Sequence, residues 1–242
     1  MPPQSPRARP LPARPPIAAA TLHQPPLVRQ LLALGLAVPG TEDTAAPSPA
    51  AAVAGAGPSL AERLAPWLAW TDAIALSGAL GAEPPAPGTP AQAAAARHQA
   101  EATRAAVQRT LAEAIEHDLP DGLAADDLPA DATPGRRYRA HQQAMERRIA
   151  PLRAQARRAL ALRSAALGRI AVLDRLLEQA LAARERQLLS ALPAWLDRRL
   201  AREPVPPATL TQPLLRAELA HRLQPVDGML AALQAATGEV QS

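Results

Sequence analysis

The feature that most constrains this chain is a long stretch, residues 136–203, that contains almost no helix-breaking residues. It holds two prolines, Pro151 and Pro193, and one glycine, Gly168. Proline lacks the backbone N–H that a helix needs, and glycine has too much conformational freedom to favour one. Small or apolar residues recur here at steps of four and three, the spacing of a helix with one apolar face. We therefore expect a long helix over about 136–202.

The apolar residues of this stretch form a predicted seam of the coiled-coil type. Ten of its eleven positions are apolar, and Arg163 is the exception. The seam consists of Met145, Ile149, Leu152, Ala156, Ala159, Arg163, Ala166, Ile170, Leu173, Leu177 and Ala180. Because leucine buries more apolar area than alanine, the leucine-rich half, residues 170–192, is expected to be the better anchored half. Pro151 and Pro193 either bend the helix or divide it, and we expect bends.

A return helix is predicted over about 209–236, after a proline-rich turn at residues 204–207. Its apolar residues share one face: Leu215, Leu219, Leu223, Val226, Leu230 and Leu233. A short connection between two helices favours antiparallel neighbours, so this face is expected to cover the leucine-rich half of the seam. Pro225 and Gly228 are expected to bend or break the return helix.

The most apolar segment is residues 59–82. Its short length, together with Pro66 and Asp72, argues against a membrane span and favours a buried core helix. Asp72 either caps a helix or pairs with an arginine of the long helix, and a catalytic role is the least expected. An alanine-rich helix over 91–118 follows, with its apolar face on three residues four apart: Val107, Leu111 and Ile115.

These segments predict an all-α, elongated bundle around the long helix, with a disordered proline-rich N-terminus. Residues 1–26 are expected to be a disordered tail, residues 27–58 a short helix and a low-complexity linker, and residues 59–242 a single helical domain. The tail is not followed by a continuous apolar run of the kind that a secretory signal needs, so we expect a cytoplasmic protein.

Charge is unevenly distributed along the chain. Residues 136–202 hold 16 arginines and 5 acidic residues, whereas residues 60–131 hold 4 arginines and 11 acidic residues. The acidic half is therefore expected to pack on the basic one. Five arginines lie away from the seam and form either a solvated face or a surface for phosphate or lipid head groups: Arg147, Arg148, Arg153, Arg157 and Arg158. Four of them are candidate interaction residues: Arg147, Arg148, Arg157 and Arg158.

The composition excludes several kinds of chemistry. The absence of cysteine excludes disulfides, thiol catalysis and cysteine-bound zinc. Glu218 and His221 form one Glu-x-x-His pair, but a di-iron bundle needs two such pairs and two further glutamates. No glycine-rich phosphate loop follows a strand pattern. We therefore expect no enzyme activity, no cofactor and no metal. The tryptophans are candidate interaction residues, although tryptophan more often lies in a core: Trp67, Trp70 and Trp195.

Three stretches together resemble a proteobacterial family of proteins of unknown function. They are WLAWTDAIALSGAL (residues 67–80), RYRAHQQAMERRIAPL (137–152) and RAELAHRLQPVDGMLAAL (216–233). The family has no assigned activity to carry over. The resemblance implies a cytoplasmic protein that assists a membrane assembly, and hence an envelope-associated complex as partner.

The sequence thus predicts a non-catalytic helical interaction or adaptor protein. It would self-associate or bind a protein partner through the apolar seam and the helix around Trp67 and Asp72. The alternative is a nucleic-acid-binding protein that uses the arginine face of the long helix.

Overall fold

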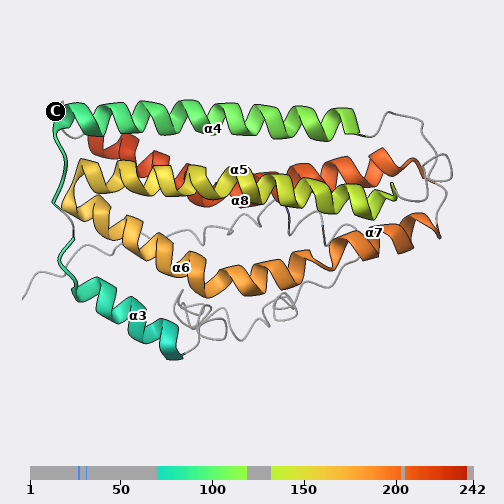
Figure 1. Ribbon diagram of the computed structural model, residues 1–242, viewed down its shortest axis with the longest axis horizontal. Coiled ribbons are helices and arrows are strands. Elements are labelled where there is room, and N and C mark those ends of the chain that lie inside the picture. Colours follow the sequence, from blue (N-terminus) through green and yellow to red (C-terminus); the bar gives the residue numbers. More distant parts are fainter. Residues whose placement is uncertain are drawn as a thin grey trace, which may run out of the picture.

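The computed structural model describes residues 27, 31, 70–84, 86–118, 132–202 and 205–238. Figure 1 shows an elongated bundle of helices, and this described part of the chain contains no strand. The predicted all-α fold is therefore confirmed. The helices are α3 (Trp70–Gly81), α4 (Pro90–Asp118), α5 (Pro134–Arg163), α6 (Ala165–Leu189), α7 (Leu192–Leu200) and α8 (Pro207–Gly238). None of these described helices combines the length and apolar composition needed to cross a membrane.

The centre of the bundle is α5, which packs against α4, α6, α7 and α8. Together α4, α5 and α8 form an inner bundle, in which α4 runs opposite to the other two (Figure 1). On the lower side of the view, α6 runs back along α5, and α3 packs on α6 at the outside. We call α3 and α6 the outer layer.

The prediction of one long helix over 136–202 is wrong, because the chain forms α5, α6 and α7 in its place. Ser164 separates α5 from α6 with an extended backbone (φ −164°, ψ 160°), and its Oγ accepts a hydrogen bond from the Leu167 N–H at 3.2 Å. A serine at this position stabilises a helix start by satisfying a backbone N–H that has no partner within the helix. The chain reverses at Ser164, so α6 lies antiparallel to α5.

The prolines are accommodated in the helices. Pro151 lies inside α5, and Pro225 lies inside α8, which continues through Gly228 to Gly238. Of the two outcomes expected at Pro225 and Gly228, a bend or a break, the break is therefore wrong. Pro193 lies in the first turn of α7, where a backbone N–H would have no intrahelical acceptor. The bend expected at Pro193 is wrong, because the chain is divided there, between the end of α6 at Leu189 and the start of α7 at Leu192.

The start of α5 is held by α7. Asp197 of α7 accepts a hydrogen bond from the Gly135 N–H at 2.7 Å, and the Thr133 side chain accepts one from the Arg136 N–H at 3.3 Å. A carboxylate is favoured at a helix N-terminus because unpaired N–H groups and the helix dipole point toward it. A Cβ on Gly135 would lie 2.5 Å from the carbonyl oxygen of Pro193, so only glycine permits this approach.

The first half of the predicted seam is confirmed as part of the core. Its buried members are Met145, Ile149, Leu152, Ala156 and Ala159. Arg163, the polar exception, donates a hydrogen bond to the carbonyl oxygen of Ala236 at 2.8 Å, near the end of α8, where a cation is favoured. The predicted face of α8 is also buried: Leu215, Leu219, Leu223, Val226, Leu230 and Leu233. Leu111 and Ile115 of α4 complete this core.

The prediction that the leucine-rich half is better anchored is wrong. The buried residues of α6 are Leu167, Gly168, Ala171 and Leu189. Ile170 is 41% exposed and Leu188 is 36% exposed. The turn at Ser164 ends the register in which α5 faces α8, so the seam does not continue into the core. Moreover, α8 packs mainly against α5 and α4, not over the leucine-rich half.

Only the end of the segment predicted as a buried core helix is described, as α3. Its described side chains are half-buried or exposed, and Ile74 is 56% exposed, so the prediction is wrong for this part. Leu27 and Leu31 are helical, and Leu27 is buried in the core. The predicted tail, the linker at 39–58 and Trp67 lie outside the described residues.

Candidate functional site

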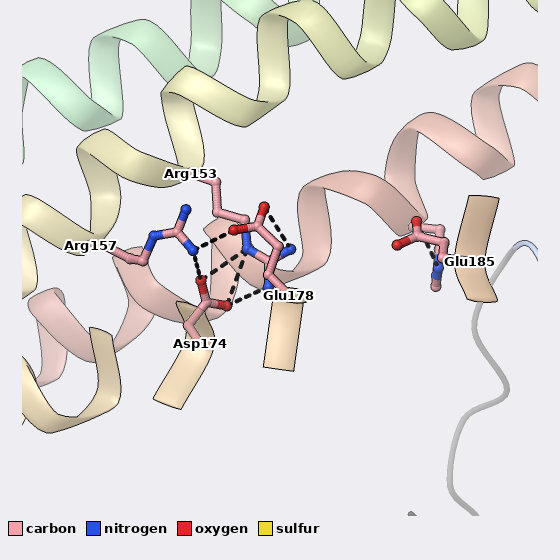
Figure 2. A network of polar contacts seen from close by, with 6 residues as sticks. Arg153, Arg157, Asp174, Glu178 and Glu185 are labelled. Atoms are coloured by element: carbon pink, nitrogen blue, oxygen red, sulfur yellow. Dashed lines mark hydrogen bonds and ion pairs between the residues drawn. The ribbon is translucent and has the colours of Figure 1, made fainter. Parts of the chain in front are cut away.

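Two arginines of α5 bind two acidic residues of α6 across the interface between these helices (Figure 2). Arg153 donates to both carboxylate oxygens of Asp174, at 2.9 Å from Nε and at 2.7 Å from Nη2. Arg157 donates from Nη1 to Asp174 at 3.1 Å and to Glu178 at 2.6 Å. Two cations thus meet two anions, and the network is electrically neutral.

Because this network is largely buried, it helps to hold α6 in position against α5. The side chains of Arg153 and Arg157 are only 15% and 11% exposed. Burial opposes the charge of Arg153, but the hydrogen bond to Asp174 and the attraction of the nearby carboxylates outweigh it, so the pKa of Arg153 is raised. Removing one partner would leave an uncompensated charge in a poorly hydrated place, which is costly.

The network also changes the interpretation of the basic face of α5. Arg157, one of the four arginines predicted to bind a partner, points toward α6, where the carboxylates of Asp174 and Glu178 balance its charge. The other three, Arg147, Arg148 and Arg158, are exposed. None of these three has a hydrogen-bond or ion-pair partner within the described ranges of the chain.

A second polar network joins α5 to α8. Glu218 is fully buried and accepts hydrogen bonds from the Tyr138 hydroxyl at 2.7 Å, from Gln142 Nε2 at 3.1 Å and from Arg222 Nε at 2.8 Å. Burial and the negative charge of Glu218 raise the pKa of Tyr138 well above its ordinary value, so its hydroxyl stays a donor. Gln142 also donates to the carbonyl oxygen of Leu189 at 3.1 Å, which ties in the end of α6.

The sequence pattern did not reveal this network, because Glu218 and His221 resembled half of a metal motif. Among the described residues, no group of three or more histidine or acidic side chains is placed to hold a metal ion. His221 Nε2 lies 3.9 Å from Glu185 Oε1 on α6. The available signal was that Glu218 lies between Leu215 and Leu219, on the apolar face of α8.

A third cluster ties the end of α4 to α5. Arg137 Nη1 donates to the backbone oxygen of Asp118 at 3.1 Å and to its Oδ1 at 3.0 Å, and His141 Nε2 lies 3.2 Å from Asp118 Oδ2. The nearby side chain of His141, aided by Arg137, lowers the pKa of Asp118 although burial opposes this. Here an acidic residue of the first half pairs with the basic stretch, as the charge distribution predicted.

The remaining predicted interaction residues do not form one cluster in the described part of the chain. Trp70 begins α3, but its side chain is not described, and Asp72 is half-buried on the same helix. Trp195 of α7 is partly buried against the core, the usual place for a tryptophan. Asp72 and Trp195 therefore belong to different parts of the bundle.

The exposed large apolar side chains of the described residues all lie on the outer layer. They are Ile74 of α3, and Ile170 and Leu188 of α6. Of the half-buried leucines between the last two, three lie on the same face of α6 as they do: Leu173, Leu177 and Leu181. We call Ile170, Leu173, Leu177, Leu181 and Leu188 the α6 stripe. It includes three members of the predicted seam that are not buried: Ile170, Leu173 and Leu177.

A family model described as "Protein of unknown function (DUF3348)" matches residues 45–203. This range includes the first two of the three stretches that carry the resemblance, whereas the third lies in α8, beyond the match. Neither the curated proteins nor the solved structures contain a significant match.

Proposed function

The chain belongs to the DUF3348 family, and we propose that it is a non-catalytic helical interaction protein that binds a protein partner through the outer layer. One observation carries this proposal: the exposed large apolar side chains of the described residues are confined to α3 and α6. Exposed apolar groups that gather on one side of a protein are typical of interaction sites.

The polar networks support the same proposal. Several buried or half-buried charged groups of the described helices hold one helix to another, as in the Arg153–Asp174 and Tyr138–Glu218 contacts. A catalytic group, by contrast, must reach a substrate. These contacts make the inner bundle a rigid support on which the outer layer is displayed.

Photo-cross-linking in cells that carry the natural gene tests this proposal. A benzoylphenylalanine placed at Ile170 or at Leu188 is expected to yield a discrete cross-linked species, either with a partner protein or with a second copy. The matched control is the same residue at Ala154, which is exposed on the outer face of α5. Equal cross-linking from all three positions, or none from the α6 positions, would contradict the proposal.

A second candidate function is nucleic-acid binding by α5. It is favoured by Arg147, Arg148 and Arg158, which are exposed and unpaired within the described ranges. If each contacts one phosphate, the logarithm of the affinity for duplex DNA falls against the logarithm of salt concentration with a slope of about −2.7. Replacing all three by glutamate should abolish the binding, and a full-length chain that passes a DNA column at low salt would exclude this function.

A further inference from the structure

We propose that arginines of α5 and α6 together form a surface that binds the phosphates of duplex nucleic acid. This inference rests on the second candidate function, nucleic-acid binding by α5, and adds the contribution of α6 and the form of the ligand. It follows from the direction in which each helix points its exposed arginines, from their spacing, and from the position of the acidic residues.

The contacts of α5 determine which way its exposed face points. Arg137, Tyr138 and Arg157 contact α4, α8 and α6, respectively. At 100° per residue these side chains lie about 80°, 180° and 280° around the helix from Arg147, whereas Arg158 lies about 20° from it. Arg147 and Arg158 are exposed and therefore point outward between α4 and α6. This is the side of α5 opposite α8, which lies behind α5 in Figure 1.

Two exposed arginines of α6, Arg175 and Arg186, lie on the same side of the bundle. Asp174 and Glu178 point to α5 and so mark the contact between the two helices. Arg175 and Arg186 lie about a quarter turn further around α6. Because α6 runs antiparallel to α5, this quarter turn leads to the side away from α8. The α6 stripe lies on the other side of the contact with α5.

These arginines form two rows of equal length. Arg147 and Arg158 are 11 residues apart, as are Arg175 and Arg186. Each pair therefore spans about three helical turns, or about 16 Å. Packed helices lie about 8–10 Å apart, and the ion pairs of Figure 2 place Arg158 beside Arg175 and Arg147 beside Arg186, within about one turn along the axis. We call these four residues the arginine face.

The arginine face keeps its positive charge. None of its members forms an ion pair within the described ranges of the chain, and Arg186 donates only to the carbonyl oxygen of Ala182 in its own helix, at 3.2 Å. Asp174 and Glu178 are balanced by the two arginines of the buried network. Of the other described acidic residues of α5 and α6, Glu185 lies near α8, and Glu146 is exposed.

Spacing and composition favour duplex nucleic acid as the ligand. A single phosphate cannot reach arginines about 16 Å apart, so the ligand must be an extended polyanion. The exposed large apolar side chains of the described residues lie on α3 and the α6 stripe, so the arginine face offers nothing of the kind that enters a membrane surface. It also has no aromatic ring for stacking single-stranded bases. A duplex presents two closely spaced rows of phosphates along a stiff rod.

The salt dependence of duplex binding to the full-length chain tests the proposal. The probe is a fluorescent DNA duplex of about 20 base pairs, and the readout is anisotropy. Arg148 lies at the edge of the arginine face next to α4, so five arginines should contact phosphates. The logarithm of affinity should then fall against the logarithm of salt concentration with a slope of about −4.5. Arg175→Gln with Arg186→Gln should reduce the slope to about −2.7.

An equal loss of charge elsewhere provides the matched control. Arg109 of α4 and Arg169 of α6 are exposed but lie off the arginine face. Arg109→Gln with Arg169→Gln should therefore leave the slope near −4.5. A change of slope equal to that of the Arg175, Arg186 variant would overturn the assignment to the arginine face. All four substitutions are at exposed positions, and circular dichroism should show that the fold persists in both variants.

The remaining outcomes separate failure of this inference from failure of the second candidate function. Duplex binding that the Arg175→Gln, Arg186→Gln variant retains unchanged would overturn the part assigned to α6 and leave binding by α5 intact. No duplex binding by the parent chain would exclude both. A single strand of the same length should bind at least about tenfold more weakly. Equal binding of the single strand, or tighter binding to phosphatidylglycerol vesicles or polyglutamate, would overturn the duplex as ligand.

Discussion

At the scale of single residues, Gly135 is a position where the fold leaves no room for a side chain. An alanine here would place its Cβ 2.5 Å from the Pro193 carbonyl oxygen and against the Asp197 carboxylate. We predict that Gly135→Ala lowers the free energy of unfolding by about 1–3 kcal/mol, because α7 must move away from the start of α5. Urea denaturation of the full-length chain measures this loss.

Gly228 provides the matched control for Gly135. It lies inside α8, and a Cβ at this position would meet no atom within 4 Å. Gly228→Ala should raise the free energy of unfolding by about 0.5–1 kcal/mol, because alanine loses less conformational freedom in a helix. If both alanine variants change stability equally, the close approach at Gly135 is not what holds α7.

We predict that Tyr138 stabilises the fold through the hydrogen bond that its hydroxyl donates to the carboxylate of Glu218. Tyr138→Phe keeps the ring but removes one donor from Glu218, which is fully buried. The free energy of unfolding should fall by about 1–3 kcal/mol, the usual cost of an unsatisfied buried group. Gln143→Ala, on the exposed face of α5, should stay within about 0.5 kcal/mol of the parent chain. A neutral Tyr138→Phe would refute the role assigned to the network.

Asp118 makes the stability of the chain depend on acidity. Its pKa in the folded chain lies below the ordinary value of 3.8, so its contribution is present above pH 3.8 and is lost as pH falls through the folded pKa. The difference in unfolding free energy between the parent chain and Asp118→Asn should therefore shrink as pH is lowered below 3.8. Denaturation at several pH values measures it, and a difference that is constant or grows toward acid would contradict the ion pair.

At the scale of elements, charged contacts contribute much of what holds helix α6 to α5. No residue between Ala171 and Leu189 is buried, and the contacts of Asp174 and Glu178 with α5 fall within this span. We predict that Asp174→Asn lowers the free energy of unfolding by about 3 kcal/mol, since Arg153 and Arg157 lose their shared partner. Hydrogen exchange should accelerate in α6 before it does in α4.

Glu146→Gln is the control for this prediction. Glu146 is an exposed acid on α5, outside the network, so its replacement should leave exchange in α6 unchanged. Faster exchange throughout the inner bundle in Asp174→Asn would show that the network does not act on α6 in particular.

The elements also show where sequence patterns are informative. The spacing of apolar residues predicted α4, the face of α8 and the first half of the seam, because these faces are covered by their own chain. The break at Ser164 was not predicted, since one serine among strong helix formers is a weak local signal. Its effect depends on α6 packing back on α5, which is a tertiary contact.

At the scale of the whole molecule, the all-α fold and the membership of a family of unknown function agree with the sequence analysis. The candidate surface was foreseen only in part. The predicted seam contained Ile170, Leu173 and Leu177. The spacing of apolar residues shows that one face of a helix packs against something, but it does not show whether that is another helix of the same chain or a partner. Ion pairs between helices also determine which arginines stay exposed. Arg157 is bound by Glu178 of α6, whereas its neighbour Arg158 is exposed.

Cysteine labelling tests the central claim, that the α6 stripe is a surface covered by a partner in the cell. The chain has no cysteine, so Ile170→Cys, Leu188→Cys and Ala154→Cys each carry a single thiol. The account predicts that a maleimide labels all three in the purified protein, but that in cells the two α6 thiols are protected while Ala154→Cys still reacts. Equal reaction of the α6 thiols in cells and in purified protein, or protection of Ala154→Cys alone, would contradict it.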